Sequence, residues 1–419
     1  MVTQHIIATP VVADAKAAKK KAALGVALYH SGTEQLPGLG HQLVPAVQKY
    51  FPKSPSEAAW DFLSLALAVF AADRFVLRSE GEDGWTRVIA LDVALANPKP
   101  WTPHLQKFAA TLRFLTGDIW QISVQGGGAK PPTLQPRLSD RDCVCLFSGG
   151  LDSLLGALRL QHDGRNPFLV SQGSPKEITP QKYLAAALKL DGFRFEGKVS
   201  EKWKPPYEGS TRARSIIFFA YGVAAAEAHG FQELFIPENG LIAINPPLTS
   251  RRMGSLSTRT THPYFLSELE DVIGGAGLNV KLTNPFEGVS KGDMLKSCKA
   301  PNIEALAAAS YSCGKGKRLN GQCGRCVPCL IRRAAFHAAG LTDKTPYKTE
   351  LAKSKRNDDV MAARIAAARA SKASKAEMAR WTAMAGPLPS DPARRKKIIA
   401  GVSKGLGELS AFLNSITWH

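Results

Sequence analysis

The chain has 419 residues, of which 44% are hydrophobic, so it is long enough for two or three globular domains with real cores. No stretch reaches the ~18 uninterrupted apolar residues of a membrane span, and the first residues lack the order of a secretory leader, so we expect a cytoplasmic protein with no membrane partner. The formal net charge of +19 favours polyanionic partners such as nucleotides, tRNA or an acidic protein, although a generally basic surface would give the same value.

The first 138 residues mix short strand-like runs, such as Gly25–Tyr29 and Arg87–Leu91, with a helical pattern over Ala58–Leu77. They end in a loop rich in glycine and proline at residues 126–132. No catalytic constellation stands out there. We therefore expect residues 1–138 to form an accessory α+β domain.

Residues 139–340 alternate between strand and helix patterns. The expected strands are residues 143–147, 167–170, 233–237 and 279–282, and the expected helices are residues 153–162, 181–190, 214–229 and 291–298. This alternation predicts an α/β fold with a doubly wound parallel sheet.

Residues 341–419 form a basic, helical C-terminal extension in which fifteen Lys and Arg face seven Asp and Glu. Its last helix carries one apolar face, made by Val402, Leu406, Leu409, Leu413 and Ile416. A solvated helical face explains the positive charge at least as well as a nucleic-acid site, and we leave nucleic acid as one possible partner.

A strand-like run at Cys143–Phe147 leads into Ser-Gly-Gly-Leu-Asp-Ser, residues 148–153. A tight turn from strand to helix leaves backbone N–H groups free to bind an anion, and small side chains let a pyrophosphate approach that backbone. Ser153 can cap the helix or contact a phosphate oxygen, and Asp152 can orient the loop or hold Mg²⁺. The alternative is a glycine-rich turn that binds nothing.

Seven cysteines occur, and four of them crowd into one segment as Cys313, Cys323, Cys326 and Cys329. Their spacing predicts a closed tetrahedral thiolate site that holds structural Zn²⁺. An iron–sulfur cluster and four unligated cysteines remain alternatives. We expect the other three, Cys143, Cys145 and Cys298, to be ordinary core residues.

The Ser-Gly-Gly-x-Asp-Ser motif resembles the PP-loop of ATP pyrophosphatases, and its combination with the cysteine motif resembles the 7-cyano-7-deazaguanine synthase (QueC) family. Thr211–Phe219 is similar to an Ala-Arg-Asn helix start of that family, with Ser215 in place of the Asn, and Ser290-Lys291 is similar to a late Ser/Thr-Lys. The resemblance covers about residues 141–340. It implies an adenine-nucleotide α-hydrolase-like fold that uses ATP, Mg²⁺ and Zn²⁺ to convert 7-carboxy-7-deazaguanine to the nitrile.

By this resemblance, Asp152, Lys291 and Arg214 are the expected catalytic residues. The expected ATP-binding residues are Ser148, Gly149, Gly150, Leu151, Asp152, Ser153 and Gln172.

The polar segment at residues 237–263 does not look like the housekeeping synthases. We take five of its residues as candidates for binding substrate, the alternative being a structured polar loop: Glu238, Asn239, Arg251, Arg259 and His262. This segment and the two terminal regions look more like the QueC-like proteins of anti-phage cassettes, with QatC of the Qat system the most similar that we can name. That resemblance implies that an amine of a partner protein from the same cassette captures the activated carboxyl group.

Three alternatives stay open. The first is nitrile synthesis for queuosine biosynthesis, and the second is a catalytically quiet scaffold that binds nucleotide and zinc in a defence complex. The third is tRNA thiolation, which usually needs a catalytic cysteine pair outside the metal motif.

Overall fold

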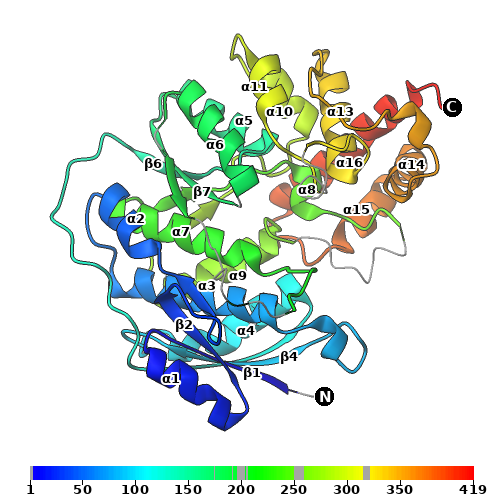
Figure 1. Cartoon of the computed structure of the whole chain (residues 1–419). Coiled ribbons are helices and arrows are strands. Elements are labelled where there is room, and N and C mark those ends of the chain that lie inside the picture. The colour runs from blue at the N-terminus through cyan, green and yellow to red at the C-terminus, as the bar shows by residue number, and fades with distance from the viewer. Residues whose placement is uncertain are drawn as a thin grey trace.

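The computed structural model describes residues 3–173, 175–190, 192–195, 203, 206–249, 259–314 and 321–419. Two five-stranded sheets, both entirely parallel, organise the first 283 residues (Figure 1). No described helix is long and apolar enough to cross a membrane.

The first sheet has the strand order β3-β2-β1-β4-β5. Its strands are β1 (Thr3–Thr9), β2 (Leu24–His30), β3 (Gly38–Gly40), β4 (Val88–Ala94) and β5 (Ile119–Gln125). The connecting helices are α1 (Val12–Ala17), α2 (Leu43–Tyr50), α3 (Glu57–Phe75) and α4 (Leu105–Thr116). The region expected to mix helices and strands thus forms a parallel sheet in which the two alternate.

The second sheet has the strand order β10-β9-β6-β7-β8, and the expected doubly wound parallel sheet is confirmed. Its strands are β6 (Cys143–Leu146), β7 (Pro167–Gln172), β8 (Gly192–Phe195), β9 (Glu233–Phe235) and β10 (Lys281–Thr283). The helices of this part are α5 (Leu151–His162), α6 (Pro175–Ala187), α7 (Arg214–His229), α8 (Gly240–Ile244), α9 (Pro263–Gly275), α10 (Lys291–Ser297) and α11 (Ile303–Ala309). The order reverses between β6 and β9, and open α/β sheets bind ligands beside such a switch point, at the carboxyl ends of the strands.

Helix α3 joins the two sheets, because it is apolar on every side and buried on every side. It packs on β2 and β4 of the first sheet and on α7 of the second, so both sheets share one hydrophobic core (Figure 1).

A buried ion network strengthens this junction. The Arg87 guanidinium lies 2.7 Å from Asp73 and 2.5 Å from Asp118. The second oxygen of Asp73 accepts the backbone N–H groups of Arg212 and Ala213, both at 2.7 Å, just before α7 begins. Asp73, a residue of the N-terminal region, therefore fixes the start of α7, a helix that packs on the second sheet.

The C-terminal part is helical, as expected. Residues 341–419 contain α14 (Asp358–Lys372), α15 (Lys375–Ala383) and α16 (Pro392–Asn414), and they follow α13 (Val327–Ala339), a helix that was not predicted. The predicted apolar face is confirmed for Val402, Leu406, Leu409 and Leu413, which are all buried, while Ile416 lies beyond the end of α16. Through this face, α16 packs on α13, α14 and α8 (Figure 1).

Candidate active site

The glycine-rich loop lies directly after β6, where the Phe147 N–H bonds the Val170 carbonyl at 2.6 Å. Gly149 adopts φ +79°, a left-handed conformation, and a Cβ there would approach the Gln181 side chain to 2.8 Å. The Gly150 and Leu151 N–H groups make only long contacts, of 3.3 and 3.4 Å, to serine hydroxyls. A phosphate could replace those weak partners at this helix start.

Ser153 does not cap α5, so that part of the sequence interpretation is wrong. Gly150 is the N-cap residue, and the Ser153 hydroxyl, already inside the helix, donates back to the Gly150 carbonyl at 3.0 Å. The Ser153 and Ser148 hydroxyls lie 3.2 Å apart, so the two serines form one polar edge of the loop.

Gln172 lies at the carboxyl end of β7, next to the loop. The side chain that links β7 to the loop is that of Gln181. The fully buried Gln181 amide donates to the carbonyls of Ser148 and Gln172, both at 3.0 Å. Gln181 was not among the residues predicted for the site; its only signal was a polar side chain at the start of an otherwise apolar helical pattern.

A compact charged cluster forms at the switch point. The Lys291 ammonium lies 2.7 Å from one Asp152 oxygen, with the lysine side chain only 3% exposed. The Asn239 amide donates to the other Asp152 oxygen at 3.2 Å and to Glu238 at 3.1 Å. The four residues come from the first turn of α5, the end of β9 and the start of α10, so the fold unites candidates that lie up to 139 positions apart, at Asp152 and Lys291.

Glu238 and Asp152 are close enough to influence each other's protonation. Desolvation, the negative charge of Asp152 and a hydrogen bond to it raise the pKa of Glu238 well above its ordinary value, while Lys291 opposes the rise. We infer that Glu238 keeps a proton that it shares with Asp152. The cluster then holds one ammonium and one carboxylate charge.

Arg214 is the first residue of α7 and is half-buried at the carboxyl side of the second sheet. Arg259 and His262 contact α4 of the N-terminal region instead of the loop. The Arg259 guanidinium stacks on the Phe114 ring at 4.6 Å and donates to its carbonyl, and the His262 ring packs on the same phenyl group. Arg251 lies outside the described residues.

His262 is neutral in this position. Its Nδ1 accepts the Tyr264 N–H and so caps α9, while burial lowers its pKa to about 3. A neutral, buried ring cannot supply a positive charge to an anionic substrate.

The four clustered cysteines bring their sulfurs within 4.8 Å of one another. The Cys313–Cys326 and Cys323–Cys329 sulfurs are 3.8 and 3.9 Å apart, and a tetrahedral ion with metal–sulfur bonds of about 2.3 Å separates its ligands by about 3.8 Å. The Cys323 sulfur also accepts the N–H groups of Arg325 and Cys326, at 3.5 and 3.2 Å. The cluster could therefore bind Zn²⁺, and its spacing favours a single ion over the larger iron–sulfur cluster.

The remaining cysteines are poor nucleophiles. Cys143 and Cys145 are buried in β6, and desolvation raises the pKa of both thiols, that of Cys143 to about 12. Burial also raises the pKa of Cys298. These protonated thiols count against a thiolation activity.

Tyr311 and Ser312, the two residues before Cys313, contact the glycine-rich loop directly. The Tyr311 N–H donates to the Gly149 carbonyl at 2.8 Å, and the Ser312 hydroxyl accepts the Leu151 N–H. The fully buried Arg332 of α13 donates to the same hydroxyl at 3.3 Å. Ser312 was not among the predicted site residues. No local sequence signal indicates that a serine beside a cysteine contacts a residue 161 positions away.

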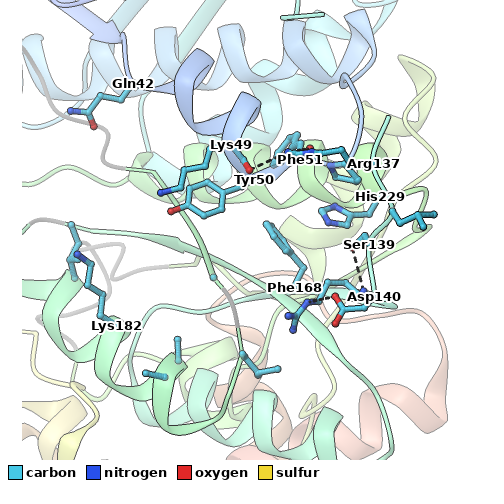
Figure 2. A pocket seen from close by; sticks show the side chains of 18 residues that line it. Gln42, Lys49, Tyr50, Phe51, Arg137, Ser139, Asp140, Phe168, Lys182 and His229 are labelled. Carbon is cyan, nitrogen blue, oxygen red and sulfur yellow. Dashed lines mark hydrogen bonds and ion pairs between the residues drawn. The ribbon is translucent and has the colours of Figure 1, made fainter. Parts of the chain in front are cut away.

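An open cavity of 760 Å³ lies at the opposite, amino edge of the second sheet (Figure 2). Lys49 of α2 and Lys182 of α6 line its two sides, and Arg137 is engaged there by the carbonyls that end α2. Because ligands of such sheets bind at the carboxyl edge, we place the candidate active site at the glycine-rich loop.

Comparison with known proteins agrees with this geometry. The QueC family, described as queuosine biosynthesis protein QueC, matches residues 260–340. The chain is 28% identical over 231 residues to a 7-cyano-7-deazaguanine synthase of Novosphingobium aromaticivorans, covering 49% of the chain and 93% of the relative. It is 27% identical over 229 residues to that of Cupriavidus taiwanensis (49% and 96%) and 25% identical over 241 residues to that of Kineococcus radiotolerans (50% and 99%). About half of the chain therefore corresponds to nearly the whole length of these synthases.

Proposed function

We propose that this chain uses ATP to adenylate the carboxylate of a 7-deazaguanine, such as 7-carboxy-7-deazaguanine. One observation carries the proposal: in a chain similar to 7-cyano-7-deazaguanine synthases, a lysine and an aspartate converge on a glycine-rich loop at the switch point of a parallel sheet. The loop amides and the positive end of α5 suit a phosphate chain. The carboxylate oxygen attacks the α-phosphorus, and pyrophosphate leaves.

The Asp152–Lys291 pair suggests how charge is managed in this step. When phosphates enter the loop, the Lys291 ammonium can exchange Asp152 for a phosphate oxygen and offset the charge that develops on pyrophosphate. Asp152, freed from the lysine, offers the hard oxygen ligand that Mg²⁺ prefers, with Glu238 beside it. Bound Mg²⁺ would neutralise phosphate charge; the residues of the chain align the nucleotide.

We propose further that an amine of a partner protein, in an anti-phage cassette, receives the activated group. The amine attacks the acyl carbon, AMP leaves and the amine loses a proton, so that an amide forms. This is supported by the half of the chain that has no counterpart in the synthases. The similarity to 7-cyano-7-deazaguanine synthases favours a second candidate, nitrile synthesis, in which ammonia forms the amide and a second adenylation drives its dehydration.

The test measures AMP and pyrophosphate after mixing the protein with ATP and 7-carboxy-7-deazaguanine. The wild type should release both, and Asp152→Asn should release neither while keeping its zinc content. Absence of AMP from folded wild-type protein would refute adenylation. Intact masses of proteins co-expressed from neighbouring genes, and the small-molecule products, then distinguish conjugation from nitrile synthesis.

A further inference from the structure

The C-terminal helix α16 contacts the start of α10 through one carboxylate. Glu408 accepts a hydrogen bond from the Ser290 hydroxyl and another, at 3.0 Å, from the Gly292 N–H. Ser290 is the N-cap residue of α10, and its hydroxyl oxygen also accepts the Asp293 N–H. Glu408 thus holds the residues immediately before and after Lys291.

The backbone of α16 lies unusually close to the segment that leads into Lys291. A Cβ at Gly401 would lie 2.4 Å from the Gly288 carbonyl, and one at Gly405 would lie 3.0 Å from the Leu241 Cβ. Positions 401, 405 and 408 share one face of a helix. The missing side chain at Gly401 lets this face approach the backbone of Gly288, three residues before Lys291, and Gly405 lets it approach α8, so Glu408 reaches the start of α10.

Small movements of this first turn matter for the charged cluster. Helix α10 has only seven residues, and Lys291 is its first. The Lys291 side chain is almost fully enclosed, with its ammonium 2.7 Å from Asp152. A shift of the turn would be passed directly to the ammonium, and a misplacement of about 1 Å is enough to slow catalysis strongly.

We propose that Glu408 is a positioning residue, through which the C-terminal extension fixes the first turn of α10 and so keeps Lys291 within reach of Asp152 and of phosphates on the glycine-rich loop. The catalytic consequence rests on the proposed function, whereas the contact itself does not. The negative charge also lies at the positive end of α10, where it stabilises the helix.

The experiment compares Glu408→Gln with Lys404→Gln, a matched control one turn earlier on α16 that pairs with Asp293 of α10 at 2.7 Å but touches neither Ser290 nor Gly292. Loss of a charge-assisted contact should lower kcat for AMP release roughly tenfold in Glu408→Gln, with KM for ATP changed less than about threefold. Lys404→Gln should behave like the wild type. In a Lys291→Ala background, Glu408→Gln should lower kcat no further, because residues that act as one unit are not additive.

Equal kcat in Glu408→Gln and the wild type, or an undiminished effect of Glu408→Gln without Lys291, would overturn the proposal. If Glu408→Gln does not fold, Ser290→Ala removes one of the two contacts and should lower kcat about threefold, since it breaks a single hydrogen bond; an unchanged kcat there also counts against positioning.

A second readout does not need the reaction. Competitive amine labelling followed by mass spectrometry should show Lys291 protected in the wild type and several-fold more reactive in Glu408→Gln, relative to the exposed Lys281. If the wild type releases no AMP, the proposed function fails, and this labelling alone decides about the contact: equal protection in both proteins would refute it.

Discussion

Asp152 and Glu238 should be able to replace each other as the counter-charge of Lys291. The ammonium is only 3% exposed and cannot rely on water. In Asp152→Asn, desolvation still raises the pKa of Glu238, but the negative charge of Asp152 no longer adds to it and Lys291 lowers it, so we expect Glu238 to ionise and balance the lysine. In Glu238→Gln, Asp152 keeps that role. Each single variant therefore keeps one counter-charge, and any loss of stability should not exceed about 1 kcal/mol.

The double variant has neither carboxylate. An uncompensated buried charge costs about 3–5 kcal/mol, so with single losses of up to about 1 kcal/mol each the pair should be non-additive by roughly 1–3 kcal/mol. Because the entropy of unfolding scales with chain length, 1 kcal/mol shifts the Tm of a protein of this length by only about 1 °C, so the apparent Tm should fall roughly 1–3 °C below the sum of the single effects.

Differential scanning fluorimetry of the four proteins at pH 7.5 measures this coupling. The same cycle in a Lys291→Met background is the control, because without the ammonium the two carboxylates should contribute independently. Simple additivity with Lys291 present would refute the shared counter-charge and, with it, our description of the cluster.

Three further predictions follow from the geometry. Glu238→Gln should gain stability relative to the wild type as pH rises above the ordinary glutamate value of 4.5, because folded Glu238 retains a proton that the unfolded chain releases; a Tm difference that stays flat from pH 5 to 8 would contradict the raised pKa. Cys326→Ser should lose bound zinc and become less soluble, whereas the fraction that still folds should keep its specific activity. Metal analysis and activity assays of the soluble fraction test this. A zinc-free variant of normal stability would exclude a structural ion. Gly149→Ala should lose roughly 1–3 kcal/mol of stability and bind ATP more weakly, because residue 149 has a left-handed backbone and a Cβ there would clash with Gln181. Gly164 has a similar φ but lies in an open turn, so Gly164→Ala should keep its ATP affinity. Calorimetry of both variants compares the two.

Local patterns predicted the elements that carry the site. The bounds of α7 agree with the expected helix, and β6, α5 and α10 lie within two residues of their predicted ends. The glycine-rich loop and the cysteine cluster could also be predicted from the sequence, because consecutive or nearly consecutive residues carry their chemistry. The convergence of Asp152 with Asn239 could be expected only in outline, from the rule that candidate residues follow parallel strands.

Contacts between segments that are distant in the sequence could not be predicted from local patterns. Strands β1 and β5 were missed. Strand β1 is too close to the chain start to be bounded by turn signals, whereas β5 carries the polar and apolar alternation of a half-buried strand and could have been predicted. Helix α3 shows no amphipathic period because it is buried on all sides, so its pattern cannot reveal which elements cover it. Ser312, Gln181 and Glu408 act through partners 33 to 161 positions away.

The hydrogen bonds from Asp73 to the residues before α7 limit how this protein can be divided into fragments. A fragment that begins near residue 139 would expose the apolar side of α7 to water and leave the backbone N–H groups of Arg212 and Ala213 without their carboxylate. Chimaeras that transplant the nucleotide-binding half should therefore carry α3 along, and modularity visible in sequence comparison need not correspond to autonomous folding.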